Sequence, residues 1–262
     1  MPTKNLPQPT SLFLLAHQDD EFGVFDEIRR AALNGTAICA YFTDGAAGSE
    51  PSRRNRESLT VLQRLGVPAE DVRFLGEANG IADGRLFEQL DVVAKALQQL
   101  LSSIPDDAMV YLPAWEGGHH DHDGLHAVAA LLLHKQGQLG RAKQFALYHA
   151  HRCVGPFFRV LQPLKENGTI TVQRLQFGNR LRYLRHCLSY PSQAKTWLGL
   201  FPFVALAMLL RGRQSMQAVQ VERVRQRPHA GKLYYEKRGF LAYETLAQAI
   251  ATHSNPGTGH EA

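Results

Sequence analysis

Short apolar runs and helix-period segments alternate through the first 150 residues, and this alternation limits the fold more than any other feature of the sequence. The predicted strands are Leu12–Leu15, Ala37–Phe42, Val72–Leu75, Met109–Leu112 and Phe145–Tyr148. Helices are predicted between them at Glu21–Leu33, Arg53–Leu65, Leu86–Leu101 and Gly124–Leu133. Strands that are apolar on both faces and separated by helices indicate an α/β fold, a three-layer sandwich with a mostly parallel sheet.

The pattern changes after about residue 155. Thr169–Leu175 alternates in the manner of an exposed or antiparallel strand, and Val219–Val224 alternates again. We therefore assign residues 1–155 to the α/β core and residues 156–262 to a C-terminal extension. This extension is expected to cap the core, completing the sheet and the pocket within the same domain.

The net charge of +5 conceals an asymmetry along the chain. Residues 1–150 carry 13 Lys/Arg against 19 Asp/Glu, whereas residues 151–262 carry 16 against 5. A basic region can attract phosphate, anionic lipid or nucleic acid. No nucleic-acid-reading module is recognisable, so no nucleic-acid partner is expected. The alternative is that two oppositely charged halves of the protein pack against each other.

We expect a cytoplasmic protein. Its three cysteines are widely spaced without a C-x-x-C motif, which is typical of a reducing compartment, and the apolar run Ser11–Ala16 is too short for a secretory signal. Trp197–Leu210 is more apolar, but its 14 residues, with Pro202 inside, fall short of the ~20 needed to cross a bilayer. Three interpretations remain for it: peripheral contact with the inner face of a membrane, a buried cap helix, or an oligomer interface.

Imidazole and carboxylate side chains follow several of the predicted strands. His17–Asp20 follow the first strand, Asp44 follows the second, and Glu116–Asp123 follow the fourth. Because the carboxyl ends of parallel strands meet at one edge of a sheet, these groups are expected to lie together. Each cluster alone has a structural explanation, as a helix N-cap or a solvated loop. Together they predict a metal site.

Histidine and aspartate ligands suit a divalent first-row metal, zinc first, and a catalytic zinc needs three protein ligands and an open position for water. His17 and Asp20 are three residues apart at a strand-to-helix turn and can face one point, while one imidazole from Gly117–Asp123 completes the set. Asp19 is adjacent and can accept a proton from the water as general base. A second imidazole can polarise a substrate carbonyl and protonate a leaving amine.

Two segments of this candidate site carry recognisable motifs. Ala16–Glu21 is similar to A-H-P-D-D-E, and Gly118–Asp123 is similar to H-P-D-H. With further similarities at Tyr41–Gly45 and Tyr190–Gln193, the chain resembles the PIG-L (LmbE-like) zinc-dependent deacetylases. The resemblance covers roughly residues 10–195, densely at the two motifs.

The resemblance implies a Rossmann-like fold and a hydrolase that removes the N-acetyl group of an amino sugar, often glucosamine-linked, releasing acetate and a free amine. It implies that Zn²⁺ is bound by His17, Asp20 and His122. Asp19 would be the general base that activates the zinc-bound water. His119 would stabilise the oxyanion or protonate the leaving amine.

Two departures from the family motifs bear on the ligand set. Gln18 and His120 stand where the family motifs have proline, and neither change removes a ligand. His120 makes the register of the second motif ambiguous and is therefore an alternative third ligand. His122 is preferred because it preserves the H-x-D-H spacing with His119.

Three further residues have a predicted supporting role, each beside a structural alternative. By resemblance, Asp121 would orient an imidazole ligand and Arg54 would contact sugar hydroxyls. An exposed helix ion pair between Arg54 and Glu57 is at least as well supported. Asp44 either lines the pocket or supports an imidazole, or it forms an Asx turn with Gly45.

The sequence therefore predicts a zinc-dependent deacetylase acting on a small-molecule or lipid-linked amino sugar. One alternative is a Mg²⁺- or Mn²⁺-dependent phosphodiesterase or sugar-nucleotide transferase, which the imidazole-rich set disfavours. The other is a non-catalytic Rossmann-like binding module. No glycine-rich nucleotide motif follows a predicted strand, which disfavours that class.

Overall fold

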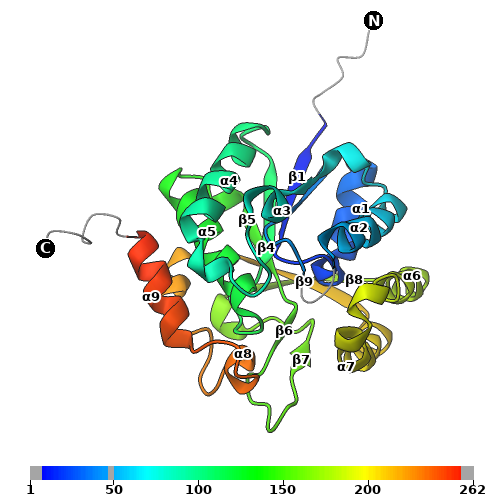
Figure 1. Cartoon of the computed structure of the whole chain (residues 1–262). Coiled ribbons are helices and arrows are strands. Elements are labelled where there is room, and N and C mark those ends of the chain that lie inside the picture. The colour runs from blue at the N-terminus through cyan, green and yellow to red at the C-terminus, as the bar shows by residue number, and fades with distance from the viewer. Residues whose placement is uncertain (1–7, 47–49, 255–262) are drawn as a thin grey trace, which may run out of the picture.

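The computed structural model describes residues 8–46 and 50–254 and is built around a seven-stranded sheet with strand order β3-β2-β1-β4-β5-β9-β8 (Figure 1). The strands are β1 Thr10–Leu15, β2 Thr36–Tyr41, β3 Val72–Phe74, β4 Met109–Pro113, β5 Ala142–Phe145, β8 Ile170–Arg174 and β9 Arg213–Ala218. The first five are parallel, β9 is antiparallel to β5, and β8 is antiparallel to β9. The mostly parallel sheet confirms the predicted fold class.

Helices cover both faces of the sheet, which gives the three layers (Figure 1). Along β1, Leu12 and Leu14 enter the core formed with α4, α5 and α9, whereas Phe13 and Leu15 enter the core formed with α1, α2, α6 and α7. Because successive strand residues point to opposite faces, a strand covered on both faces is apolar throughout. The helices are α1 Phe25–Asn34, α2 Pro51–Leu65, α3 Leu75–Asn79, α4 Leu90–Ser102, α5 His120–Lys135, α6 Phe177–Cys187, α7 Ala194–Leu206, α8 Tyr234–Lys237 and α9 Tyr243–Ser254.

The antiparallel end of the sheet was only half predicted. The expected strand at Thr169–Leu175 is confirmed as β8, but its neighbour β9 lies just before the predicted Val219–Val224. β9 is buried although it is rich in polar residues. Gln217 shows how this is tolerated, since its amide donates hydrogen bonds of 2.8 Å to the backbone oxygens of Leu164 and Gly168. A strand that buries polar side chains in this way has no apolar alternation to detect.

The predicted strand Phe145–Tyr148 is also displaced, because β5 ends where that strand was expected to begin. After Phe145 the chain leaves the sheet. The backbone amides of Leu147 and Tyr148 donate to the buried carboxylate of Glu116, at 2.6 and 2.9 Å, instead of to a neighbouring strand. A side chain thus replaces a ladder partner, and the chain leaves the main sheet through Ala146 and Leu147 before a short separate strand begins at Tyr148.

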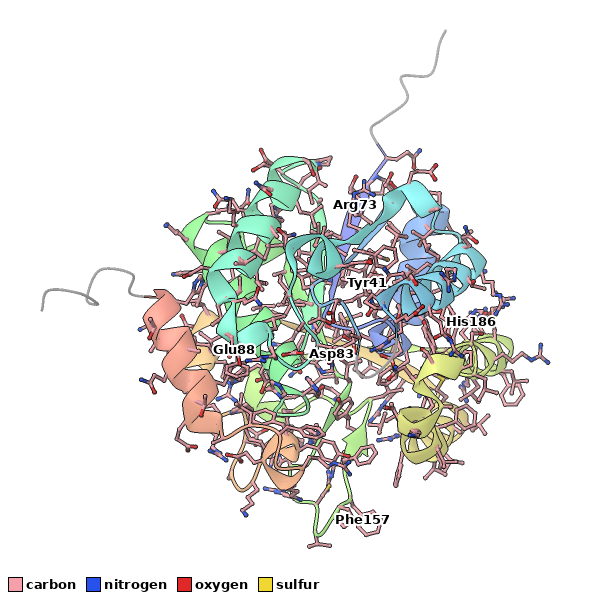
Figure 2. All side chains as sticks on the ribbon, in the orientation of Figure 1. Tyr41, Arg73, Asp83, Glu88, Phe157 and His186 are labelled. Atoms are coloured by element: carbon pink, nitrogen blue, oxygen red, sulfur yellow. The ribbon has the colours of Figure 1, made fainter. Side chains whose placement is uncertain are left out.

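Beyond β5 the chain forms a ribbon of β6 (Tyr148–His149) and β7 (Arg159–Val160), which lies with α8 beside the carboxyl ends of the parallel strands (Figure 1). Phe157 projects from the tip of this ribbon (Figure 2). α6 and α7 lie together on the opposite side of the same edge, near α1 and α2. The region 156–262 therefore surrounds the strand ends that were predicted to carry the site, while the boundary at residue 155 stays a prediction.

α7 belongs to a longer helical segment than the sequence suggested. Pro191–Arg211 forms 21 continuous helical residues, and in the described part of the chain it alone is long and apolar enough to cross a membrane by length and composition. The estimate of 14 residues was too short, because Pro202 lies inside the helix without ending it. Core helices of soluble proteins pass the same test, so this finding by itself does not establish a membrane span.

Candidate metal centre and active site

The polar groups predicted from the strand ends do meet in space. His17–Asp20 follow β1, Asp44 follows β2, and the second motif lies after β4 at the start of α5. α5 begins at His120 rather than at the predicted Gly124. His119 caps it, since its Nδ1 accepts the backbone N–H of Asp121 at 3.2 Å. The second motif is therefore held on a helix end and not in a flexible loop.

His17, Asp20 and His122 form a compact buried cluster. His122 Nε2 lies 2.9 Å from Asp20 Oδ1 and 3.2 Å from His17 Nδ1. The other carboxylate oxygen of Asp20 accepts the backbone N–H groups of Ala16 and His17 at 2.9 and 2.8 Å. A 3-10 turn follows at Asp20–Gly23, so the helix that was predicted from Glu21 starts only at Phe25.

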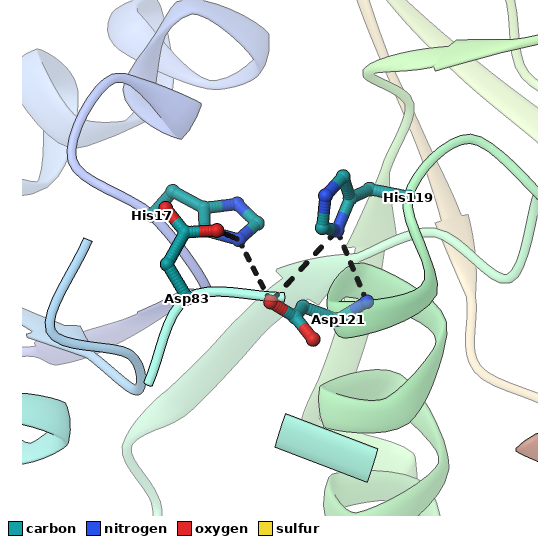
Figure 3. A group of neighbouring side chains, drawn as sticks. All are labelled: His17, Asp83, His119 and Asp121. Carbon is teal, nitrogen blue, oxygen red and sulfur yellow. Dashed lines mark hydrogen bonds and ion pairs between the residues drawn. The ribbon is translucent and has the colours of Figure 1, made fainter. Parts of the chain in front are cut away.

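The opposite nitrogen of His17 faces two carboxylates (Figure 3). Its Nε2 lies 3.1 Å from Asp121 Oδ2 and 3.3 Å from Asp83 Oδ1. Asp121 is fixed in turn by the backbone N–H groups of Gly84 and Leu86, at 2.6 and 3.2 Å. With its proton on Nε2 between these carboxylates, His17 presents the lone pair of Nδ1 to Asp20 and His122.

The electrostatics of the cluster favour a cation. Burial alone would raise the pKa of Asp20, but the charges and hydrogen bonds of His122 and His17 outweigh burial and hold that pKa well below its usual range. Asp121 is buried and Asp83 is partly buried, and the neighbouring imidazoles outweigh this burial and lower the pKa of each. Burial disfavours a charged His17, yet these carboxylates, Asp83 foremost, raise its pKa well above the usual value. Buried carboxylates that stay ionised need positive charge close by.

The structure brings His122, and not His120, to the cluster. One atom from each of His17, Asp20 and His122 lies within 4.8 Å of the others, the spacing of groups that share one ion. The His120 Nε2 is instead 2.8 Å from the backbone oxygen of Gly84. Two imidazole nitrogens and one carboxylate oxygen form a donor set that fits Zn²⁺ and leaves one position open.

Asp19 lies between His17 and Asp20 in the sequence, but its carboxylate faces Arg54 and Trp197 instead of the cluster. The backbone of Asp19 has φ 132°, a conformation that residues other than glycine rarely adopt. This conformation turns its carboxylate away from that of Asp20. One oxygen is 3.3 Å from the Arg54 guanidinium, and the other accepts the Trp197 indole N–H at 3.1 Å. Burial raises the pKa of Asp19 above the usual carboxyl range although Arg54 opposes it. Such a carboxylate suits a general base.

His119 stands on the other side of the cluster. Its ring meets that of His17 edge to face, with centroids 4.6 Å apart. Because Nδ1 accepts the Asp121 amide, the neutral ring carries its proton on Nε2. Burial, and then the charge of His17, lowers the pKa of His119 well below its usual value. His119 is therefore a neutral hydrogen-bond donor.

Arg54 and Asp44 act on other site residues. Arg54 is 2% exposed and donates to Asp19, to Asp83 at 3.1 Å, and to backbone oxygens. The predicted alternative of an exposed pair with Glu57 is wrong, since Glu57 pairs with Arg53. The Asx turn at Asp44 is confirmed, because its Oδ1 accepts the N–H of Ala46, and the same oxygen also accepts the N–H of Asp83, both at 2.9 Å.

These groups border a cavity of about 570 Å³, which we call the central pocket. Its floor contains His17, Asp19, Asp20, His119 and Asp83. Its walls come from the β6–β7 ribbon, the start of α7 and the α8 region, with lining residues Tyr148, Phe158, Gln193, Lys195, Thr196, Gly199, Leu200, Tyr234, Arg238 and Phe240. Most of the wall therefore comes from residues 156–262.

Sequence reasoning missed Asp83 and Trp197. Asp83 lies near the middle of the molecule (Figure 2), on a loop that precedes a helix rather than directly after a strand. Its neighbours in sequence are Ala82, Gly84 and Arg85, which form no recognised motif. Trp197 reaches Asp19 across 178 residues. No local pattern reports such a contact, although an isolated indole in an apolar helix was a signal worth testing.

Gly118 holds His119 close to the β6–β7 ribbon, and its replacement by alanine should destabilise the fold. An added Cβ would lie 2.1 Å from the backbone oxygen of Tyr148, so the backbone beside His119 must shift. We expect a loss of about 1–3 kcal/mol in the free energy of unfolding, measured by urea denaturation, and reduced activity. Gly178→Ala is the matched control, because no described atom lies within 4 Å of its Cβ. Equal stability of the two variants would contradict the close approach.

Comparison with solved structures gives the same fold class, an α/β protein with a mostly parallel central sheet. Conserved protein TT1542 from Thermus thermophilus superposes with a TM-score of 0.57 at 18% identity, covering 80% of this chain and 94% of that chain. The zinc-inhibited form of teicoplanin deacetylase Orf2 has a TM-score of 0.54 at 16% identity, covering 79% and 97%. No curated protein matches the sequence.

A family model matches part of the sequence. Residues 12–132 match the family model described as PIG-L: GlcNAc-PI de-N-acetylase. This match, over 121 of the 262 residues, confirms the predicted resemblance to the PIG-L family.

Proposed function

We propose that the protein is a zinc-dependent hydrolase that removes the N-acetyl group from an amino-sugar-containing substrate. The observation that carries this proposal is the meeting of His17, Asp20 and His122 beside the carboxylate of Asp19. The PIG-L family match supports a deacetylase, and one structural neighbour is named as a teicoplanin deacetylase. That neighbour is also named as a zinc-inhibited form, which supports zinc as the metal.

His17 Nδ1, Asp20 Oδ1 and His122 Nε2 would hold the metal. When bound there, zinc would lower the pKa of a coordinated water and polarise the amide carbonyl. Asp121 would keep the proton of His17 on Nε2, so that Nδ1 remains a donor atom. Asp20 would be kept in place by its two backbone N–H bonds.

Asp19 and His119, beside the cluster, have different roles in amide hydrolysis. Asp19, with its raised pKa, takes the proton from the attacking water. His119 donates its Nε2–H to the oxygen of the tetrahedral intermediate. The protonated Asp19 then gives the proton to the departing nitrogen, so that the C–N bond breaks and the amine leaves as a neutral group. The acetic acid left behind passes its proton to solvent and leaves as acetate. Arg54 holds Asp19 in position throughout.

The central pocket suits a sugar-sized group. Its volume of about 570 Å³ falls within the range of small-molecule sites. Tyr148, Phe158 and Tyr234 provide aromatic faces, and their rings lie 5.1 to 6.1 Å apart. Asp83 and Arg54 place a carboxylate and a guanidinium where hydroxyl groups can bind. We propose an amino sugar as substrate and a cytoplasmic location for the enzyme.

The function is tested by acetate release from a panel of N-acetylated amino sugars with zinc-loaded protein. We expect acetate from at least one member, loss of activity to background after chelation, and recovery when zinc is added. The chelated protein itself serves as the matched control. Hydrolysis of phosphodiesters to phosphomonoesters with Mg²⁺ or Mn²⁺, and no release of acetate, would replace the proposal with the phosphodiesterase alternative.

A further inference from the structure

α7 has two faces with different surroundings. Trp197, Leu200 and Val204 point into the core and are at most 7% exposed. The opposite face carries Leu198 and continues to Leu210 on the helical turn Ala207–Arg211 that follows α7, and these two leucines are 81% and 75% exposed. The inner face is sufficient to attach the helix, so the outer leucines contribute little to the stability of the fold.

The exposed apolar residues form a continuous stripe. They are Leu198, Pro202, Leu206, Leu209 and Leu210, spaced at three and four residues along the helix. This spacing places them on one side of a helix, and we call this side the α7 surface. Beside it lies an apolar groove of about 310 Å³ between the ends of α6 and α7, bordered by Leu188 and Leu198. A contiguous apolar area of this kind marks an interaction site.

The sequence around the α7 surface is basic. Between Glu166 and Glu222 the chain contains seven Lys/Arg and no Asp or Glu. Five of the seven are exposed: Arg174, Arg182, Arg185, Lys195 and Arg213. Leucines on one side of a helix with Lys/Arg around them are the pattern of segments that lie in the plane of an anionic membrane surface.

We propose that the α7 surface docks onto an anionic phospholipid bilayer. A second copy of the chain fits the same surface poorly, because a symmetric contact would bring two sets of like charges together. Crossing of the bilayer by Pro191–Arg211 does not fit either, since Trp197 on this segment hydrogen-bonds Asp19 inside the domain. The helix therefore lies on the membrane while it remains packed on the protein.

Docking would bring the central pocket to the membrane. Lys195, Thr196 and Gly199 of α7 line that pocket, while Leu198 and Pro202 belong to the docking side. An amino sugar carried on a lipid would then reach the pocket without leaving the bilayer. This consequence rests on the proposed deacetylase function, whereas docking itself does not.

The test is co-sedimentation of the full chain with vesicles at low salt. We expect binding to vesicles of three parts phosphatidylcholine to one part phosphatidylglycerol, little binding to phosphatidylcholine alone, and weaker binding when salt is raised. Combined Leu198→Ser, Leu206→Ser and Leu210→Ser should reduce binding about tenfold or more. Leu33→Ser on α1 is the matched control, because Leu33 is 64% exposed but lies outside the α7 surface. A second variant, Arg182→Gln with Arg185→Gln, should also bind less while leaving apolar packing unchanged.

Three results would overturn docking. They are no sedimentation of wild-type protein with anionic vesicles, equal loss of binding in Leu33→Ser, and a wild-type dimer in analytical ultracentrifugation that the leucine variant alone dissociates. Thermal unfolding of each variant shows whether it is folded, and the arginine variant decides the outcome if the leucine variant is not. Acetate release from a soluble substrate is measured separately, so a failed deacetylase assay leaves the vesicle result intact.

Discussion

His122→Ala should yield folded protein that holds no zinc and has no measurable deacetylase activity. His122 Nε2 is one of three donor atoms within 4.8 Å of one another, and its loss leaves one imidazole and one carboxylate. Two such donors bind zinc weakly. The affinity should fall by more than the ~10–100-fold typical of replacing an outer partner of a ligand. Metal content by mass spectrometry, together with acetate release, measures both effects.

His120→Ala is the matched control for this variant. His120 lies two residues away on the same helix turn and is equally buried, but its ring stacks on His119 and faces Gly84. We expect zinc content near that of wild type and a partial loss of rate through disturbance of His119. Loss of zinc in His120→Ala, with zinc retained in His122→Ala, would reverse the assignment of the third ligand.

Asp19→Asn should keep zinc and lose turnover. The amide retains the shape of the carboxylate, and Asn is among the residues that tolerate positive φ, so the strained turn is preserved. It cannot accept a proton from water, and general-base catalysis typically contributes ~10²–10⁴-fold. We expect kcat to fall by about that factor with metal content unchanged.

The pH profile distinguishes loss of a base from a general disturbance. Because Asp19 must be deprotonated to act and burial raises its pKa, wild-type activity should fall as the pH is lowered, and this acid limb should disappear in Asp19→Asn. Asp107→Asn, an exposed carboxyl change remote from the pocket, is the control and should leave rate and profile unaltered. Full activity of Asp19→Asn, or loss of its zinc, would contradict the assigned role.

The part of the site that could be predicted is the part that follows strands. His17, Asp20 and His122 lie just after β1 and β4, and parallel topology alone brings such positions to one edge. Asp83 was not predicted because it lies on a loop. Asp44 and Arg54, which are 39 and 29 residues away from Asp83 in the sequence, hold that loop through hydrogen bonds. A local sequence pattern cannot reveal contacts between residues that are this far apart in the chain.

The fold shows the same division. β1, β2 and β4 were found because they are apolar on both faces and lie between helices. β9 and the end of β5 were misplaced where side chains, Gln217 and Glu116, satisfy buried backbone groups. Hydrophobic periodicity detects strands that are buried among apolar side chains. It does not detect a strand whose buried backbone groups are hydrogen-bonded by polar side chains.

The indole of Trp197 connects α7, which forms part of the wall of the central pocket, to the carboxylate of Asp19 through a hydrogen bond. An attempt to change substrate preference by exchanging α7 for the corresponding segment of another protein would remove a hydrogen bond from Asp19 along with the old wall. A replacement for α7 that lacks tryptophan at this position would change the catalytic rate as well as the substrate preference. Transplanted segments should therefore retain this single side chain.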